Sequence, residues 1–191
     1  MRPGRRARIT ERVREYTAHG WPVAALAVPW GPRCPCGSSC ADPHVVSGVV
    51  TTPGEAAKVW VPSHEWDVAL VTSWFDVVDL PARYGAMLNH KLITTCPTAT
   101  VPLGRRWHFV VGAGSFPADL VAAAGGTIHS GPDDWIAASP TSTEATGRIG
   151  WVVPPLLTRW QPFHRADLVD VVFATVSLSK ARGQTMRRPD R

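Results

Sequence analysis

The sequence predicts a single domain of the α+β class, in which short helices and short strands alternate along the chain. A chain of 191 residues is long enough for one sizeable core and too short for two. Hydrophobic residues make up 45% and charged residues 18%, a balance typical of a folded protein. The 18 prolines are spread over the whole length, which indicates short elements separated by turns rather than a bundle of long helices.

The first third of the chain has two helical patterns around one strand. Apolar residues at helical spacing predict an amphipathic helix over 8–19, and Gly20 stands where a helix ends. The apolar run over 22–28 predicts a buried strand that a proline closes. The second helix is expected over 52–60, with Thr52 as N-cap and a proline at its first position.

The remaining elements follow from the same criteria of length and period. Strands are predicted over 67–72, 75–80, 107–111, 135–138 and 150–153, and helices over 82–92, 116–124 and 166–176. Helices therefore stand between strands and not in a separate block, which agrees with α/β or α+β organisation.

The net charge of +5 is concentrated near the two ends of the chain. Residues 1–14 hold six arginines and residues 180–191 five basic residues, whereas residues 16–179 hold nine basic and twelve acidic ones, a net charge of −3. We therefore expect a basic disordered tail over 1–7, a folded domain over 8–179 and a second basic disordered tail over 180–191. Such tails either hold a nucleic-acid backbone by counterion release or are simply solvated ends.

Neither a membrane span nor an export signal is expected. No stretch approaches the roughly 20 apolar residues that cross a bilayer. The basic N-terminus resembles the start of a signal peptide, but two glutamates interrupt the segment where the apolar region would follow. The expected compartment is the cytoplasm, where cysteines serve as metal ligands or core thiols more often than as disulfides.

Three thiols and an imidazole fall within eleven residues, at Cys34, Cys36, Cys40 and His44. Soft thiolates with one imidazole suit a tetrahedral Zn²⁺ ion, and four protein ligands would make its role structural. The alternatives are a loop of free thiols and a redox pair. Cys96 stands apart from this group and is expected to be an ordinary buried thiol.

Two acidic residues, Asp76 and Asp79, lie in the apolar run Phe75–Leu80. Carboxylates on a buried strand can hold the Mg²⁺ or Mn²⁺ ions of a nucleotidyl transferase. Because the two are three positions apart, a regular strand would point them to opposite faces. The alternatives are therefore a catalytic pair on a bent strand and local capping or surface hydrogen bonds.

Basic residues at the start of the next strand, Arg105, Arg106 and His108, are candidates for contacting a nucleotide phosphate, since arginine binds phosphate in a bidentate manner. The alternative is a turn with exposed arginines.

Taken in order, several short segments resemble the N-terminal domain of bifunctional DNA primase/polymerases, in its shortened actinobacterial-type members. The similarity covers roughly residues 13–175. It is carried by the segments His19-Gly-Trp-Pro-Val23, the Cys34–His44 loop, Leu70–Ser73, Phe75-Asp-Val-Val-Asp-Leu-Pro81, Arg106–Val111, Trp135–Ser142 and Trp151–Pro155.

The resemblance implies an archaeo-eukaryotic primase-like domain, with a mixed central sheet flanked by helices and a two-metal nucleotidyl-transfer site. Asp79 matches the first residue of the family's acidic pair, but Pro81 stands at the second. The family's motif histidine falls at Arg106, with His108 two positions along, and its third acidic position falls near His129. One carboxylate cannot bridge two divalent ions, and proline offers no ligand.

Three functions follow from these residues. The first is a primase/polymerase-like domain without polymerase activity, kept for nucleotide or nucleic-acid binding or for regulation. The second is an active Mg²⁺- or Mn²⁺-dependent nucleotidyl transferase. The third is a zinc-stabilised protein-interaction module with no role in nucleic-acid binding.

Overall fold

The computed structural model describes residues 3–31, 33–62 and 65–164. The helix predicted over 166–176 and the C-terminal tail over 180–191 lie outside the described residues. No helix in the described part of the chain is long and apolar enough to cross a membrane.

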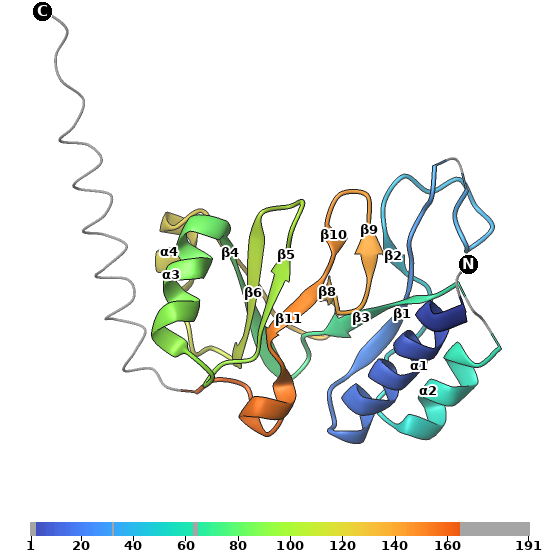
Figure 1. Cartoon of the computed structure of the whole chain (residues 1–191), viewed down its shortest axis with the longest axis horizontal. Helices are drawn as coiled ribbons and strands as arrows, with labels where there is room; N and C mark the ends of the chain where they lie inside the picture. The colour runs from blue at the N-terminus through green and yellow to red at the C-terminus, as the bar shows by residue number, and fades with distance from the viewer. Residues whose placement is uncertain (1–2, 32, 63–64, 165–191) are drawn as a thin grey trace, which may run out of the picture.

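The described chain alternates helices and strands in the order that Figure 1 shows. The helices are α1 (Pro3–Ala18), α2 (Pro53–Trp60), α3 (Ala82–Leu92), α4 (Ala118–Ala123) and the 3₁₀ turn η1 (Pro155–Thr158). The strands are β1 (Val23–Ala27), β2 (His44–Val45), β3 (Asp67–Val71), β4 (Phe75–Pro81), β5 (Thr98–Val101), β6 (Arg106–Gly112), β7 (Thr127–His129), β8 (Trp135–Ala137), β9 (Ser142–Thr143), β10 (Gly147–Arg148) and β11 (Gly150–Val153).

All the strands of the described residues except β9 and β10 form two sheets. The first sheet has the order β2-β1-β3-β8, and the second sheet has the order β11-β5-β6-β4-β7. A short hairpin pairs β9 with β10. The chain passes from the first sheet to the second between β3 and β4 and returns between β7 and β8, so the sheets lie side by side (Figure 1).

The α+β class is confirmed, whereas the arrangement of the strands differs from the single mixed sheet that the resemblance implied. Every ladder between named strands is antiparallel. Among the described residues, no helix joins two consecutive strands that lie next to each other in a sheet, which is the connection that a parallel pair requires.

The first helix begins earlier than expected. It starts at Pro3, so residues 3–7 are helical where the composition predicted a disordered tail. Proline is well accommodated in the first turn, since the backbone N–H it lacks has no partner inside the helix. The predicted end is confirmed at Gly20, which has a φ of +75°.

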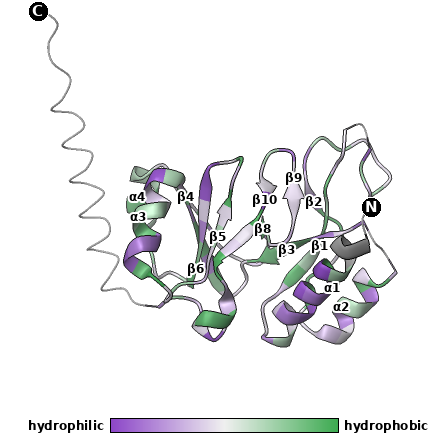
Figure 2. Cartoon of the chain, viewed as in Figure 1, coloured by the Kyte–Doolittle hydropathy of each residue, from purple (hydrophilic) through white to green (hydrophobic). Residues whose placement is uncertain are grey.

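The core shared by the two sheets holds them together as one body. It contains Val23 and Leu70 of the first sheet together with Val77 and Val110 of the second sheet, and all four are 0% exposed. Helices α1 and α2 cover one face of the first sheet at one end of the molecule (Figure 1). In Figure 2, α1 is largely hydrophilic in colour, because it contributes to this core through one stripe of residues: Ile9, Val13 and Tyr16.

The second sheet uses its two faces differently. On one face, Val78, Leu80, Phe109 and Val111 pack with α3 and α4. On the other face, the apolar residues of β4 and β6 enter the shared core at one end of the strands and give way to polar residues at the other end. The polar end of this face carries Asp79 on β4 and Arg106 and His108 on β6.

Candidate metal centre and a polar sheet face

The three cysteines and the histidine of the loop after β1 lie together. One ligand atom from each of Cys34, Cys36, Cys40 and His44 falls within 4.8 Å of all the others. The pairing of β1 with β2 brings the two ends of the loop together. His44 is the first residue of β2 and pairs with Ala27 at the end of β1.

Tight turns within the loop between β1 and β2 bring the three cysteines close to one another. The Trp30 N–H donates to the Arg33 carbonyl at 2.8 Å, and Gly37, with a φ of +85°, turns the chain back so that its N–H donates to the Cys34 carbonyl at 3.0 Å. A side chain at position 37 would strain this turn, because a positive φ favours glycine.

The distances fit a tetrahedral ion. The Sγ atoms of Cys36 and Cys34 are 3.3 Å apart, those of Cys36 and Cys40 3.4 Å, and Cys40 Sγ lies 3.7 Å from His44 Nε2. Metal–sulfur bonds of about 2.3 Å and metal–nitrogen bonds of about 2.0 Å predict S–S edges of about 3.8 Å and S–N edges of about 3.5 Å in a tetrahedron. The cluster could therefore bind a metal such as zinc with small adjustments.

Hydrogen bonding in the loop shifts the pKa values of two of the thiols in opposite directions. Hydrogen bonds from the backbone at Ser38 and from the neighbouring thiols lower the pKa of Cys36 to about 6, and the hydrogen bond with Cys36 raises that of Cys40 to about 11. A metal ligand must be a thiolate, and Cys36 reaches that form near neutral pH. His44 Nδ1 lies 3.0 Å from the Asp42 carbonyl oxygen, a contact that fixes the proton on Nδ1 and leaves Nε2 as the ligand atom.

Cys96 is separate from this cluster, as expected. It is 0% exposed, and its thiol donates to the carbonyl oxygens of Pro97 and Val110 at 3.6 and 3.5 Å. Burial raises its pKa, so Cys96 is an inert core thiol.

The two acidic residues of β4 point to opposite faces of the second sheet, as their spacing predicted. Asp76 lies on the face covered by the helices, where its Oδ2 accepts the Gly114 N–H at 2.7 Å. Asp79 lies on the other face and bonds to Arg106. Strand β4 pairs with β6 in regular register over all seven residues, so no bend brings the two carboxylates together.

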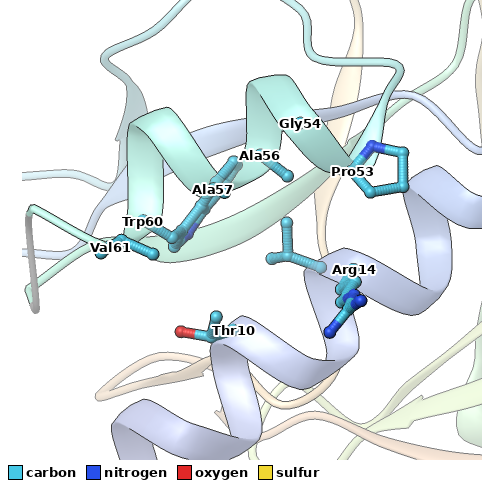
Figure 3. A pocket seen from close by; sticks show the side chains of 9 residues that line it. Thr10, Arg14, Pro53, Gly54, Ala56, Ala57, Trp60 and Val61 are labelled. Atoms are coloured by element: carbon cyan, nitrogen blue, oxygen red, sulfur yellow. The ribbon is translucent and has the colours of Figure 1, made fainter.

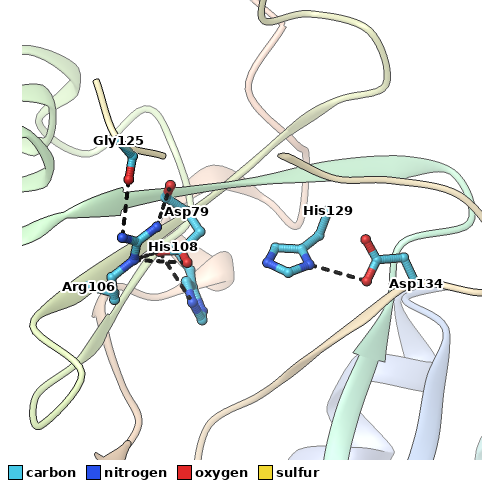
Figure 4. Close-up of polar contacts among 6 residues, drawn as sticks. All are labelled: Asp79, Arg106, His108, Gly125, His129 and Asp134. Carbon is cyan, nitrogen blue, oxygen red and sulfur yellow. Dashed lines mark hydrogen bonds and ion pairs between the residues drawn. The ribbon is translucent and has the colours of Figure 1, made fainter. Parts of the chain in front are cut away.

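Asp79 belongs to a group that we call the polar face: Asp79, Arg106, His108 and His129 (Figure 4). These residues share a face because Asp79 pairs with His108, and Arg106 and His129 pair with positions 81 and 77 of the same strand. Reasoning from the residues placed Arg106 and His108 among phosphate contacts, and the family resemblance assigned Asp79, Arg106, His108 and the position near His129 to the motifs of one nucleotidyl-transfer site.

The guanidinium group of Arg106 is hydrogen-bonded to other groups of the protein. Its Nε donates to both carboxylate oxygens of Asp79, at 2.8 and 3.0 Å. Its terminal nitrogens donate to the carbonyl oxygens of Gly125 at 3.2 Å and Asp79 at 3.3 Å (Figure 4). A phosphate would have to compete with these bonds for Arg106, whereas Arg105, also proposed as a phosphate contact, is exposed in the preceding turn.

His108 is buried beside this ion pair. Its residue is 9% exposed, its Nε2 lies 3.8 Å from Asp79 Oδ1, and its Nδ1 has no hydrogen-bond partner among the described residues. Burial lowers the pKa of His108 to about 4, although Asp79 acts in the opposite direction. At neutral pH His108 is therefore uncharged, and it can offer a phosphate a hydrogen bond but no positive charge.

A second histidine faces the same group from the neighbouring strand. His129 Nδ1 lies 3.2 Å from Asp134 Oδ1 (Figure 4). Asp134 also accepts the N–H groups of Trp135 at 2.7 Å and Ser130 at 3.2 Å, so the turn that holds it also fixes the histidine.

A separate hollow lies between α1 and α2 (Figure 3). It has a volume of about 390 Å³, and its lining is mainly apolar, with Arg14 among the lining residues: Thr10, Val13, Arg14, Pro53, Gly54, Ala56, Ala57, Trp60 and Val61. None of the residues that the sequence singled out for chemistry lies in it.

Comparison with known proteins identifies no relative: no protein family, no curated protein and no solved structure matches the chain. The resemblance to primase/polymerase domains therefore stays a prediction from short motifs.

Proposed function

We propose that this chain is a primase/polymerase-like domain that binds nucleotides or nucleic acid and lacks polymerase activity. One observation carries the proposal. The polar face holds a single carboxylate of the acidic motif, Asp79, and Arg106 already neutralises it with two hydrogen bonds. Two-metal nucleotidyl transfer needs carboxylates that are free to hold the cations, and the nearby Asp76 lies on the opposite face.

The decisive experiment is template-dependent nucleotide incorporation by the purified protein with Mn²⁺ or Mg²⁺. We expect no incorporation above that of a blank preparation. If product appears and Asp79→Asn abolishes it, the proposal is wrong and the chain is an active nucleotidyl transferase.

The binding role is tested separately with a fluorescent single-stranded oligonucleotide and a labelled nucleoside triphosphate. Arg105 is exposed beside the polar face, so we expect Arg105→Ala to weaken binding by about two- to tenfold, with a smaller dependence of affinity on salt. Arg83→Ala is the matched control, because it removes the same charge from an exposed position on α3, which packs against the other face of the second sheet. Equal losses in the two variants would indicate non-specific attraction.

The metal that we propose for the Cys34, Cys36, Cys40 and His44 cluster is a structural zinc ion. Three thiolates with one imidazole favour zinc over harder cations, and four protein ligands leave no open position for catalysis. The ion would order a loop that contributes little to the apolar core.

Metal analysis of protein without an affinity tag tests the zinc proposal. We expect about one zinc per chain, and its loss in Cys36→Ser. Cys96→Ser is the control, since Cys96 is buried far along the chain from the cluster and should leave the metal content unchanged. A content below about a tenth of an equivalent would reject the metal.

A second candidate function is a zinc-stabilised protein-interaction module. The observation in its favour is that Arg106 makes its hydrogen bonds inside the protein, while residues 16–179 carry a net charge of −3. This function predicts zinc in the protein and no binding of nucleotide or single-stranded DNA in the experiments above.

A further inference from the structure

We propose that Asp79, His108 and His129 form a site for one divalent transition-metal ion, and that Arg106 keeps this site closed by acting as an internal cation on Asp79. The site is distinct from the cysteine cluster and contains no thiolate. The inference deepens the proposed function, because it gives a physical reason why the polar face does not hold metal.

The ligand types carry the first step of the argument. Two imidazoles and one carboxylate on one side of an ion are the typical donors for first-row divalent metals with open positions. Asp79 and His108 are direct cross-strand partners, and His129 is the partner of Val77, two residues from Asp79 on the same strand. Diagonal neighbours of this kind lie about 7–8 Å apart at Cα, within reach of long side chains.

The second step is the state of His108. A buried imidazole normally has a hydrogen-bond partner, since an unpaired buried nitrogen costs free energy. His108 is 9% exposed, yet its Nε2 is 3.8 Å from Asp79, too far for a hydrogen bond, and its Nδ1 has no partner among the described residues. This is the state expected of a ligand without its metal.

The third step is the orientation of His129. Its Nδ1 faces the Asp134 carboxylate at 3.2 Å, and its ring lies between Asp134 and the group around Asp79 (Figure 4). A carboxylate on one ring nitrogen is the usual device that turns the other nitrogen toward a metal and raises its basicity. Asp134 is itself fixed by two backbone N–H groups, so this orientation is built into the turn.

The fourth step explains how Arg106 keeps a metal ion from reaching Asp79. The Arg106 guanidinium occupies both oxygens of Asp79 and is anchored to two backbone carbonyls, so a cation must displace a fixed charge to reach the carboxylate. The ligand atoms are accordingly not gathered: among the described residues, only the cysteine cluster has three or more metal-ligating atoms within 4.8 Å of one another. Removing the guanidinium leaves Asp79 with an unpaired negative charge next to two imidazole donors.

Mn²⁺ titration followed by electron paramagnetic resonance tests the proposal in the absence of nucleotide. Hard Mn²⁺ ions bind poorly to thiolates, so the cysteine cluster does not contribute to the signal. We expect Arg106→Ala to bind about one more Mn²⁺ than the unmodified protein, at least about tenfold more tightly than any residual site. We expect Asp79→Asn to remove that ion in the Arg106→Ala background, and His129→Ala to weaken it by about tenfold.

Three control variants make the result decisive. Arg105→Ala removes the same charge from the neighbouring residue and should gain no ion. Asp76→Asn, on the opposite face, should not change the ion gained by Arg106→Ala. Arg106→Gln keeps a donor for the Gly125 carbonyl and serves if the alanine variant does not fold.

The proposal is overturned if folded Arg106→Ala and Arg106→Gln gain no ion, or if Arg105→Ala gains as much. It is also overturned if the unmodified protein already binds an ion that depends on Asp79. None of these outcomes depends on incorporation or nucleotide binding, so failure of this inference and failure of the proposed function are distinguishable.

Discussion

Two buried hydrogen bonds meet at the hydroxyl of Tyr16, on the inner face of α1. The hydroxyl donates to the Ser139 carbonyl at 2.9 Å and accepts the Trp151 Nε1–H at 3.0 Å. The ring lies among those of Trp21, Trp151 and Trp160, with centroids 6.0–6.4 Å away. Burial raises the pKa of Tyr16, so the hydroxyl stays a donor at all ordinary pH values.

Tyr16→Phe should therefore lower the free energy of unfolding by about 1–3 kcal/mol, because it leaves two polar groups without their partner and keeps the ring. Urea unfolding measures this as a lower midpoint with an unchanged slope. Tyr84→Phe is the control: Tyr84 is also buried, at 5% exposed, but its hydroxyl has no hydrogen bond to the described residues. Equal losses in the two variants would contradict the role of the Tyr16 hydroxyl.

The buried ring of His108 predicts a pH dependence of stability. Its pKa falls from an ordinary value of 6.5 to about 4 in the folded protein, so the unfolded chain binds more protons between these values. Stability attributable to this residue is therefore highest above pH 6.5 and decreases as the pH falls toward 4. The full effect is at most about 3 kcal/mol, at 1.36 kcal/mol per pKa unit.

His108→Gln removes this titration, so its stability should depend less on pH in that window than the stability of the unmodified protein. Urea midpoints measured at intervals through the window test the difference. His90→Gln, at an exposed position on α3, is the control and should keep the original slope. Parallel pH profiles for His108→Gln and the unmodified protein would contradict a buried neutral imidazole.

Helix α2 shows how one element is fixed by its own residues. The Thr52 hydroxyl accepts the Glu55 N–H at 3.3 Å, and Glu55 Oε2 accepts the N–H groups of Thr52 and Thr51, each at 3.2 Å. This is a complete capping box, with proline at the first helical position. The same bonds lower the pKa of Glu55, so the stability that they contribute is present above pH 4.5 and is lost as the pH falls through the lower folded value.

Thr52→Ala should lower the free energy of unfolding by about 0.5–2 kcal/mol, since an N–H group of the first turn loses its acceptor. Thr51→Ala is the matched control, because Thr51 is exposed and contributes only its backbone N–H to the cap. Thermal unfolding should show a lower midpoint for Thr52→Ala and a nearly unchanged one for Thr51→Ala. The reverse order would contradict the capping box.

The alternation of side chains along β4 predicts one property of Asp76 and Asp79 and leaves another undetermined. Its alternation places Asp76 and Asp79 on opposite faces, and the period of two residues alone predicts this. The alternation does not say which face is covered by helices. That depends on α3 and α4, which pack on the side of Val78 and Leu80 and leave Asp79 on the polar face.

At the scale of the whole molecule, the two sheets unfold as one unit if the shared core couples them. Residues of α1, β1, β3, β4 and β6 all contribute to that core. Val77, which is 0% exposed, lies in the second sheet but contacts the core of the first.

We expect urea unfolding of the protein to give the same midpoint by tryptophan fluorescence and by far-ultraviolet circular dichroism. Val77→Ala should lower both midpoints together, by about 1–3 kcal/mol in the free energy of unfolding, because it opens a cavity in the shared core. Met87→Ala, at an exposed position on α3, is the control and should have little effect. Two separate transitions would show that the sheets fold independently.

The sequence by itself determined the local features of this protein. Helices α1 to α4, six of the strands (β1, β3, β4, β6, β8 and β11), the end of α1 at Gly20 and the cap of α2 follow from period, capping and turn chemistry, which act over a few neighbouring residues. The cysteine cluster was predictable for the same reason, since its four ligands lie within eleven residues and the loop between them is short.

Only the tertiary structure decided which distant residues meet. The strands β2, β5, β7, β9 and β10 were not predicted from their own residues, and they form because a neighbouring strand offers hydrogen bonds. The pairing of β4 with β6 and β7 brings Arg106, His108 and His129 to Asp79 from positions 27 to 50 residues away. Strand pairing is a non-local interaction, and its register cannot be obtained from the residues of one strand alone.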